Sequence, residues 1–411
     1  MSWGQRHAFT ASFLGWTLDA FDFFLVTFVV TYLAADFHQT IKQVAVAIAV
    51  TLMFRPLGAL IFGWLADRYG RRVPLMVDIA FYSLIELATA FSPNLTVFIV
   101  LRAIYGIAMG GEWGIGAALA MEALPAKSRG VFSGILQEGY SLGFLLAAVV
   151  FGIAYPFVGW RGMFVIGVLP ALLILYIRTK VPESTVWQAH AHTALRAKSR
   201  DVMGSVRRYL PLFIYTVILM AAFNFMSHGT QDLYPTFLEV QRKLSHVTVT
   251  TLAIIYNLGA IAGGIAFGAL SERIGRRISI ALAAGLGILT IPLWVHAPSV
   301  MLLGVGGFLL QFMVQGAWGI VPAHLNEISP PGARGTFPGL TYQLGNLISA
   351  GAVVYEAGLA KTRFPLAHGG ADYGAALSVI ALAVFLAVIV LALLGFAVVP
   401  EHRDADFTLS S

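Results

Sequence analysis

The sequence predicts an all-α membrane protein in which twelve transmembrane helices form two pseudo-symmetric six-helix bundles. Of the 411 residues, 58% are hydrophobic and only 11% are charged, and the mean hydropathy is +0.80. A soluble protein of this size needs far more charge on its surface. The apolar segments are about 20 residues long, which suits a bilayer-crossing helix, and they lack the alternation of barrel strands. The two halves of the chain also repeat one another, which predicts two related bundles.

The apolar segments define the order of the predicted helices along the chain. Six spans form an N-terminal bundle within residues 1–178, and six more form a C-terminal bundle within residues 210–411. The polar interval 179–209 is expected to be a cytoplasmic linker with room for a short amphipathic helix. The expected spans are residues 10–35, 44–66, 74–92, 96–121, 130–154, 161–178, 210–238, 247–270, 278–296, 299–324, 335–358 and 373–399.

The basic residues predict how the chain lies in the membrane. Most Lys and Arg residues fall in loops on the side that also holds both termini. Cytoplasmic loops are enriched in Lys and Arg, so we expect a multi-pass protein of the plasma membrane, the bacterial inner membrane, with both termini in the cytoplasm. The formal net charge of +6 is then explained by anionic lipid rather than by nucleic acid. The N-terminus lacks the pattern of a removable signal peptide.

An internal repeat relates the two halves. The segment from Gly63 to Arg72, G-W-L-A-D-R-Y-G-R-R, recurs as G-A-L-S-E-R-I-G-R-R from Gly268 to Arg277. The same offset carries Trp113 to Trp318 and several other positions to identical residues, which is strong evidence for duplication. Two parallel bundles related in this way predict a binding site at their interface, near the bilayer midplane.

The seventh span carries a polar stripe within its apolar run. Asn224, His228 and Gln231 fall on one face at helical spacing, and Asp232 lies beside them. An ionisable group at bilayer depth is costly, so it normally faces a partner or a watery cavity. We therefore expect this stripe to line a solute path. A metal site is not expected, because no second His or Glu lies at ligand spacing on this helix.

Two motifs connect the sequence with a known superfamily. The G-x-L-x-D-R-x-G-R-R loop after span two resembles a hallmark of the major facilitator superfamily, and Arg102, Gly106 and Gly110 in span four resemble a second superfamily motif. Together with the twelve spans and the repeat, the resemblance covers nearly the whole chain. It implies the major facilitator fold.

Narrower motifs resemble the sialate:proton symporter family within that superfamily. They are L-D-A-F-D-F from Leu18 and G-G-E-W from Gly110. The span-seven segment from Asn224 to Thr236 is similar, at every specified position, to the N-x-x-[S/T]-H-x-[S/T]-Q-D-x-x-x-T signature of Jen-type lactate and pyruvate permeases. This resemblance implies uptake of a short monocarboxylate coupled to a proton, with no other cofactor.

Arg55, well inside span two, is the candidate for binding the substrate anion, because its planar guanidinium matches a carboxylate. The alternative is a permanent ion pair with Asp19, Asp22 or Glu138. The two roles can coexist if protonation of Asp22 frees Arg55 for the substrate. The other candidate substrate-binding residues, for which polar packing is the alternative role, are Gln137, Tyr140, Asn224, His228, Gln231, Tyr342, Gln343 and Asn346.

Acidic residues in spans one, four, five and seven are candidates for proton coupling. Asp19 and Asp22 share a helix face, and two carboxylates that close in a low-dielectric interior resist being ionised together. Asp232 either orients His228 or carries the proton itself. Glu138, Arg102 and Glu112 complete the set. The alternatives are a buried structural acid in span one and a structural ion pair between spans four and one.

Charged residues at the cytoplasmic ends form a separate set, repeated in both halves. We expect them to act as latches that close the inner face and break when it opens. Opposite charges are kept in both halves, which suggests gating rather than substrate binding. They are Asp67, Arg71, Glu122 and Arg129, with their repeat partners Glu272, Arg276, Glu327 and Arg334.

The predicted function is therefore proton-coupled symport of a lactate- or pyruvate-like acid by alternating access, by a protein expected to be a monomer. One alternative is symport of sialic acid or another organic or aromatic acid. A second is a non-transporting sensor or a membrane enzyme, but the sequence offers no long soluble domain and no nucleophile, metal or phosphate-cradling pattern.

Overall fold

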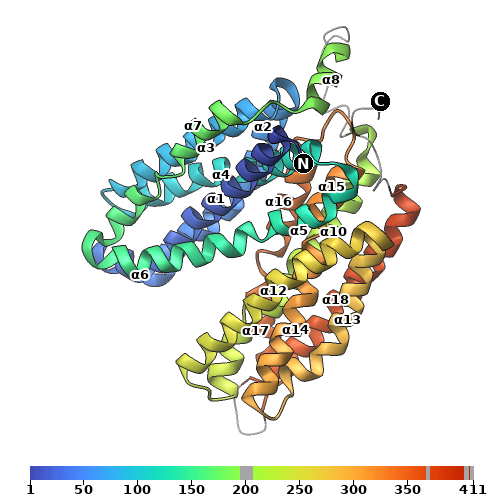
Figure 1. The fold of residues 1–411 in the computed structure, drawn as a ribbon. Helices are drawn as coiled ribbons and strands as arrows, with labels where there is room; N and C mark the ends of the chain where they lie inside the picture. Colours follow the sequence, from blue (N-terminus) through green and yellow to red (C-terminus); the bar gives the residue numbers. More distant parts are fainter. Residues whose placement is uncertain (195–206, 367–370, 402–406, 408–411) are drawn as a thin grey trace.

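The computed structural model describes residues 1–194, 207–366, 371–401 and 407. Its helices form two bundles that meet along one side (Figure 1). The N-terminal bundle contains α1 (Trp3–Asp36), α2 (Ile41–Tyr69), α3 (Arg72–Ala90), α4 (Leu95–Ala123), the short η1 (Ala126–Ser128), α5 (Arg129–Gln137), α6 (Gly139–Ile166) and α7 (Ala171–Lys180). The C-terminal bundle contains α10 (Leu210–Gln231), α11 (Tyr234–Thr236), η2 (Phe237–Gln241), α12 (His246–Ile274), α13 (Arg276–Val295), α14 (Val300–Trp318), α15 (Val321–Ile328), α16 (Phe337–Ser349), α17 (Ala352–Arg363) and α18 (Tyr373–Val398).

Ten helical segments in the described residues are long and apolar enough to cross a membrane. The remaining two predicted spans, 161–178 and 335–358, are each built from two shorter pieces: the end of α6 with α7, and α16 with α17. The chain reverses within α6 at Gly159, whose φ of +62° suits glycine. The protein is thus a multi-pass membrane protein with the predicted all-helical architecture.

Sequence signals set the helix ends. Ser2 and Gln5 form a capping box at the start of α1, and Thr40 and Gln43 form another at the start of α2. Repeat partners Gly70 and Gly275 both have φ near +100°, at 97° and 99°, where the chain turns into α3 and α13. The same tight turn is therefore built twice, as the repeated motif predicts.

The predicted span seven is not one continuous helix. α10 ends at Gln231, directly before Asp232, and a short helix starts again at Tyr234 with Pro235 in its first turn. Proline has no N–H to donate, so it suits a first turn and interrupts a longer helix. The polar stripe therefore lies at the end of a helix, where side chains reach into the space between the bundles.

Small residues let the two bundles approach closely. α2 and α4 contact α16, and α5 contacts α12. A Cβ on Gly63 would lie 2.6 Å from the Cα of Thr336, and one on Gly130 would lie 2.3 Å from the carbonyl oxygen of Gly268. Such close backbone packing is typical of interfaces between membrane helices.

The linker is partly described. Its first part forms the short helix α8 (Thr185–Ala194), which lies at the end of the molecule that also holds both termini (Figure 1). We call this end the terminal face. The rest of the predicted linker up to residue 206, with its basic residues Arg196, Lys198 and Arg200, lies outside the described residues.

Candidate substrate cavity and latches

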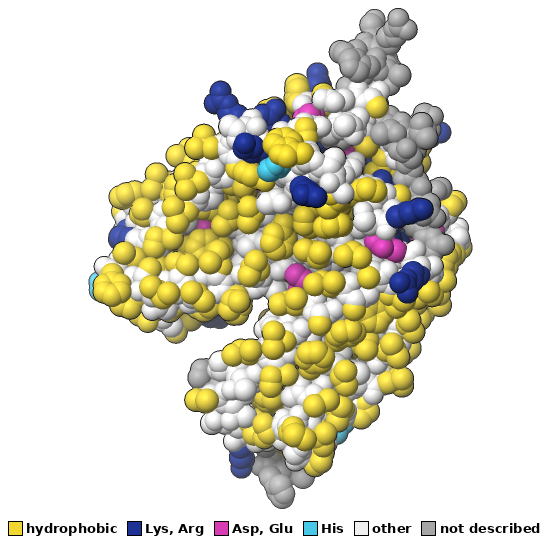
Figure 2. Space-filling model, in the orientation of Figure 1, with side chains coloured by type: hydrophobic (Ala, Val, Ile, Leu, Met, Phe, Trp, Pro, Cys, Tyr) yellow, Lys and Arg dark blue, Asp and Glu magenta, His cyan; other side chains and the backbone are white. Residues whose placement is uncertain are grey.

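A polar cavity of about 370 Å³ lies between the two bundles. Figure 2 shows the molecule hollowed between its halves on the side away from the terminal face. Both bundles contribute to the lining. The predicted residues in the lining are Arg55, Gln137, Tyr140, Asn224, His228, Gln231, Asp232, Tyr342 and Asn346. Fold and repeat thus bring residues from α2, α5, α6, α10 and α16 to one place.

Arg55 reaches the cavity from inside the N-terminal bundle. Its side chain is 2% exposed, and within the described residues its Nε and Nη2 atoms have no hydrogen-bond partner. The predicted ion pairs with Asp19, Asp22 or Glu138 are absent from the described part of the chain at ion-pair distance. A buried guanidinium with unsatisfied donors is a strong site for a carboxylate, because burial without a partner is costly.

The C-terminal wall of the cavity is the polar stripe. His228 Nδ1 lies 2.8 Å from Asp232 Oδ2, and these side chains are 35% and 31% exposed. Gln231 donates to Gln311 at 3.0 Å, whereas Asn224 donates to its own helix at Met220 O. The stripe is therefore partly satisfied by its own contacts and still open to the cavity.

Aromatic side chains form much of the remaining wall. Tyr140 stacks on Trp16, with ring centroids 5.4 Å apart. Tyr342 lies between the repeat partners Trp113 and Trp318, at centroid distances of 4.6 and 5.7 Å. Gln137 accepts a hydrogen bond from Trp113 at 3.3 Å. Sequence reasoning did not select Tyr256 and Asn257, which also line the cavity, because a single polar residue in span eight gives no distinctive pattern.

Gln343 and Glu138 follow lining residues in the sequence but lie outside the lining. Gln343 is fully buried and accepts a hydrogen bond from Asn346 at 3.4 Å. Glu138 is 7% exposed and accepts from Ser141 at 3.2 Å, with its other oxygen against Gly264. Both are close to the lining in sequence but are held in the packing behind it.

The predicted acids of the N-terminal bundle are buried behind the cavity. Asp19 and Asp22 are 0% exposed, and none of their carboxylate oxygens has a hydrogen-bond partner in the described residues. The charge of Arg55 acts on Asp19, whereas Asp22 is influenced by Glu86, Asp19 and Arg102. Asp19, rather than Asp22, is therefore the acid that Arg55 influences.

Arg102 pairs with α3 and not with α1. It lies 2.5 Å from Glu86 and donates to Thr89 at 2.9 Å. Glu112 instead lies near Asp78, also on α3, and none of the four carboxylate oxygens of these two residues has a hydrogen-bond partner in the described residues. The structural pairing of span four is thus with span three.

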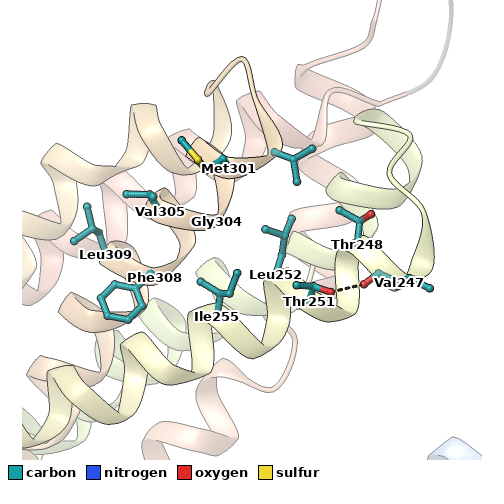
Figure 3. Close-up of a pocket in the computed structure, with 11 residues that line it drawn as sticks. Val247, Thr248, Thr251, Leu252, Ile255, Met301, Gly304, Val305, Phe308 and Leu309 are labelled. Carbon is teal, nitrogen blue, oxygen red and sulfur yellow. Dashed lines mark hydrogen bonds between the residues drawn. The ribbon is translucent and has the colours of Figure 1, made fainter.

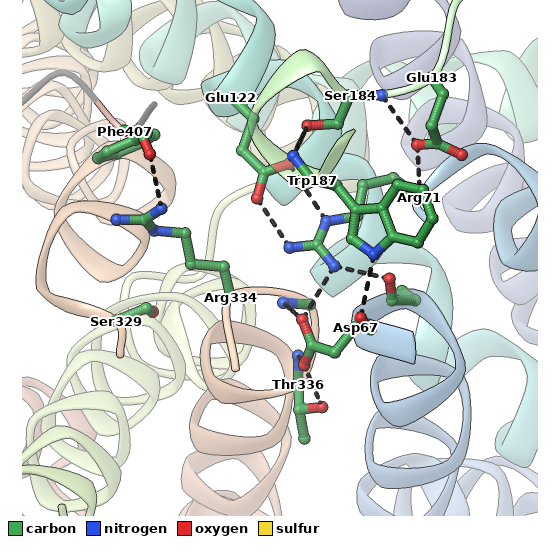
Figure 4. A network of polar contacts seen from close by, with 12 residues as sticks. Asp67, Arg71, Glu122, Glu183, Ser184, Trp187, Ser329, Arg334, Thr336 and Phe407 are labelled. Atoms are coloured by element: carbon green, nitrogen blue, oxygen red, sulfur yellow. Dashed lines mark hydrogen bonds and ion pairs between the residues drawn. The ribbon is translucent and has the colours of Figure 1, made fainter. Parts of the chain in front are cut away.

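The residues of the first predicted latch contact one another in the N-terminal bundle, and Figure 4 shows their network of polar contacts. Arg71 bridges Asp67, at 2.9 Å, and Glu122, at 2.8 Å. Asp67 also accepts three hydrogen bonds from the other bundle: from Gly335 N at 2.7 Å, and from Thr336 N and Oγ1 at 3.0 and 2.7 Å. Its carboxylate therefore caps the start of α16, where free backbone N–H groups favour an anion.

The second latch is the repeat partner of the first. Glu272 accepts from Val131 N at 3.0 Å, at the start of α5, and the repeat offset carries Val131 to Thr336. Arg276 binds Glu327 through two hydrogen bonds, at 2.7 and 3.0 Å. Each bundle thus places one carboxylate on a helix start of the other bundle.

Arg129 and Arg334, the remaining basic residues of the predicted latches, meet at Phe407. Both guanidinium groups lie over the ring of Phe407, at 3.6 and 4.2 Å from its centroid. Burial lowers the pKa of Arg334 to about 10. At Arg71, by contrast, burial alone would lower the pKa, but the carboxylates of Glu122 and Asp67 outweigh it and raise it above its ordinary value.

The start of the linker covers the first latch, which sequence reasoning missed. Ser184 donates to Glu122 at 2.5 Å, and Trp187 donates to the backbone oxygen of Asp67 at 3.0 Å. Glu183 accepts from Arg71 N at 2.7 Å, and Glu401 accepts in the same way from Arg276 N. A signal was present, because V-P-E occurs at both 181–183 and 399–401.

A second hollow has a different character (Figure 3). It lies between α12 and α14, has a volume of about 560 Å³, and its lining is almost wholly apolar. Leu252, Ile255, Val305 and Phe308 are typical of this lining, which holds no charged side chain. It offers nothing to bind an acid. Nowhere in the described residues are three or more His, Asp or Glu side chains placed to hold a metal ion.

Comparison with known proteins defines the class. The profile of the Major Facilitator Superfamily matches residues 12–354. A solved structure of the proton:xylose symporter XylE, 19% identical, matches the fold with a TM-score of 0.76 over 98% of both chains. The chain belongs to the major facilitator superfamily, a group of membrane transporters rather than enzymes.

Curated relatives narrow the resemblance. A carboxylic acid transporter protein homolog of Saccharomyces cerevisiae is 32% identical over 98% of this chain and 70% of its own length. A probable 4-methylmuconolactone transporter of Cupriavidus pinatubonensis is 30% identical over 97% of this chain and 91% of its own length. The sialic acid transporter NanX of Escherichia coli is 31% identical over 83% of this chain and 84% of its own length. All three are similar to this chain to nearly the same degree.

Proposed function

We propose that the protein is a proton-coupled symporter of a short monocarboxylate such as lactate or pyruvate. The observation that carries this proposal is Arg55, a buried guanidinium with unsatisfied donors at the wall of a cavity between two bundles. A bidentate carboxylate satisfies these donors and neutralises the charge. The relative from Saccharomyces cerevisiae, whose name specifies carboxylic acid transport, supports the same substrate class.

The charge of the cavity favours one carboxylate over two. Arg55 is the single Lys or Arg among the described residues that line it, and Asp232 adds a negative charge on the opposite wall. A monoanion that pairs with Arg55 neutralises the charge on the N-terminal wall of the cavity. A dianion would carry a second carboxylate toward Asp232, which opposes binding by like-charge repulsion.

The proton is proposed to reside on the buried pair Asp19 and Asp22. Two buried carboxylates without hydrogen-bond donors favour uptake of a proton, since protonation removes a charge that is costly to bury. Arg55 acts electrostatically on Asp19. When a substrate carboxylate neutralises Arg55, Asp19 loses that favourable charge and binds a proton more readily. Substrate and proton are thus taken up together.

Alternating access follows from the latches. In this state the two cross-bundle caps, Asp67 on α16 and Glu272 on α5, hold the terminal face shut while the cavity lies beyond them. Rocking of the bundles would break both caps and open the cavity to the terminal face. We propose that this face is cytoplasmic, in a bacterial inner membrane, because most Lys and Arg residues lie there.

A second candidate substrate is a larger organic or aromatic acid. The aromatic lining, with Tyr140, Phe144, Trp318 and Tyr342, would suit an apolar ring beside the carboxylate. The lining amides would suit the hydroxyl groups of a sialic acid. Relatives whose names specify a methylmuconolactone and sialic acid support a larger organic acid as the second candidate substrate.

Uptake by purified protein in liposomes tests the proposal. Radiolabelled lactate should accumulate when an inward proton gradient is imposed and should leave when the gradient is dissipated. Competition by unlabelled pyruvate, sialic acid, an aromatic monoacid and a dicarboxylate then ranks the substrates. Accumulation of sialic acid or the aromatic acid without lactate would select the second candidate. Binding without any uptake would contradict transport.

A further inference from the structure

We infer that Glu356 is a second proton-binding residue, which makes symport by this protein electrogenic. The residue lies on α17 of the C-terminal bundle, apart from Asp19 and Asp22 in the N-terminal bundle. The inference rests on the proposed function, because it assigns the number of protons that accompany one carboxylate.

Glu356 is a buried acid that no Lys, Arg or His of the described residues contacts at ion-pair distance. It is 2% exposed, and its Oε2 atom has no hydrogen-bond partner in the described residues. Burial of an unpaired carboxylate is costly, and protonation removes the charge. Glu356 therefore holds a proton in this state of the protein.

The carboxyl group has a prepared place against α10. Its Oε1 atom lies 3.3 Å from the position that a Cβ on Gly229 would take, and Cγ2 of Ile380, on α18, lies 2.8 Å from the same position. Gly229 directly follows His228 in the sequence. The absence of a side chain at Gly229 thus lets Glu356 pack against the same helix turn that presents the polar stripe to the cavity.

The titratable groups around this place connect Glu356 with the cavity. Among the described residues, α10 contributes His228 and Asp232, and Asp232 is the charged group that acts on Glu356. The helix α18 contributes no charged side chain at all. From α12 and α6, Tyr256 and Tyr140 also lie within the influence of Asp232.

This arrangement gives the proton a path of exchange. The proton leaves the Glu356 carboxyl group for the Asp232 carboxylate, which becomes neutral as Glu356 becomes ionised. Asp232 then passes it through its 2.8 Å contact with His228, or directly, to water in the cavity. Asp232 and His228 are about one-third exposed, so they form the wet side of a site whose dry side is Glu356.

The consequence concerns charge movement. One monocarboxylate with one proton carries no net charge, whereas one monocarboxylate with two protons carries one positive charge. With one proton on the Asp19 and Asp22 pair and one on Glu356, an inside-negative membrane potential alone should drive lactate into liposomes at equal pH.

The test compares wild type with Glu356→Gln, which keeps the size of the side chain and removes the titratable group. In sodium-free liposomes, a potassium diffusion potential should drive lactate accumulation by the wild type at least tenfold above the zero-potential level. The variant should retain accumulation driven by a pH gradient and lose the response to potential. Asp36→Asn, an exposed acid that pairs with Arg161 at 3.2 Å, is the matched control and should behave as wild type.

A second readout does not depend on transport. Infrared spectra of protein labelled with ¹³C-glutamate should show the carbonyl stretch of a protonated carboxyl group that Glu356→Gln lacks. Unchanged potential dependence in the variant, or a wild type that responds only to the pH gradient, overturns the role of Glu356 and leaves symport intact. Failure of the wild type to accumulate lactate under any gradient overturns the proposed function instead.

Discussion

The two bundles descend from one repeated pattern but treat their charges in opposite ways. In the N-terminal bundle, Asp19 and Asp22 are 0% exposed and lie behind the cavity wall. The repeat offset carries them to Asn224 and Ser227, which line the cavity beside the partly exposed His228 and Asp232. Around these repeated positions, the N-terminal bundle thus buries its acids, whereas the C-terminal bundle exposes Asp232 to the cavity. Residues at equivalent positions of the two repeats therefore need not have the same function.

A second contrast concerns the two latches at the terminal face. Both place a carboxylate of one bundle on a helix start of the other, but Asp67 accepts three hydrogen bonds there and Glu272 accepts one. In the described part of the linker, Ser184 and Trp187 contact the first latch and no residue contacts the second. Both latches therefore have the same repeated arrangement, and the contacts from Ser184 and Trp187 strengthen the first latch.

The largest effect is expected from the removal of a buried acid in the N-terminal bundle. In Asp22→Asn the side chain can no longer bind or release a proton, so accumulation of lactate under a proton gradient should be lost. Exchange of labelled for unlabelled lactate across the same liposomes should persist, since exchange needs no net proton movement. Accumulation and exchange are measured side by side. Normal accumulation by a correctly inserted variant would remove Asp22 from the coupling mechanism.

The next effect concerns the cation that connects the dry and wet sides. Arg55→Lys keeps the charge but loses the planar fork, so the KM for lactate should rise about 100-fold, which corresponds to ~2.7 kcal/mol. Arg161→Lys is the matched control, because Arg161 is 45% exposed and lies in a surface pair. If both variants bind lactate with wild-type affinity, Arg55 is not the anion site.

The wet side should be less sensitive than the dry side. His228→Ala removes a side chain that is 35% exposed and pairs with Asp232, and such an exposed pair contributes about 1 kcal/mol or less to folding. We expect the transport rate to fall roughly tenfold while the thermal unfolding temperature changes little. A fully active variant, or one that loses stability and activity together, would contradict a direct role in transport.

The smallest effects separate the two latches. Asp67→Asn and Glu272→Gln should both expose the cavity to the terminal face, and Asp67→Asn should do so more, because three charge-assisted hydrogen bonds weaken rather than one. The chain has no cysteine, so a single Asn257→Cys in the cavity lining reports access to thiol reagents from that face. We expect labelling to rise several-fold in the first variant and about twofold in the second. Equal rates in the two variants would show that the two additional hydrogen bonds of Asp67 do not strengthen the first latch.

Much of the site was predictable because its residues stand out chemically. A guanidinium or a histidine within an apolar span is costly unless it is used, so Arg55 and His228 could be selected from sequence alone. Gln343 could not be separated from Tyr342 in this way. They are neighbours in one helix, and only the packing of that helix decides which of them faces the cavity.

Other residues gave no local signal. Ser184 and Trp187 act through contacts with Asp67 and Glu122, more than 60 positions away in sequence. Glu356 was indistinguishable from an ordinary acid near a helix end, because its burial depends on Gly229 and Ile380 from two other helices. Contacts of this kind join segments whose sequences carry no trace of one another.

The sequence by itself determined that the protein lies in a membrane, where its helices run and that its two halves are duplicated. These properties depend on local features: hydropathy, the positions of proline and glycine, and a constant repeat offset. The tertiary structure decided which polar side chains are exposed to the cavity and which are buried against other side chains. Which side chains are buried depends on how the helices rotate and cross. Small residues such as Gly63, Gly130 and Gly229 permit close crossings, but the sequence does not indicate which helix each of them contacts. The physical reason is that the burial of a side chain depends on the packing of the whole bundle, whereas its polarity and charge depend on the residue type alone.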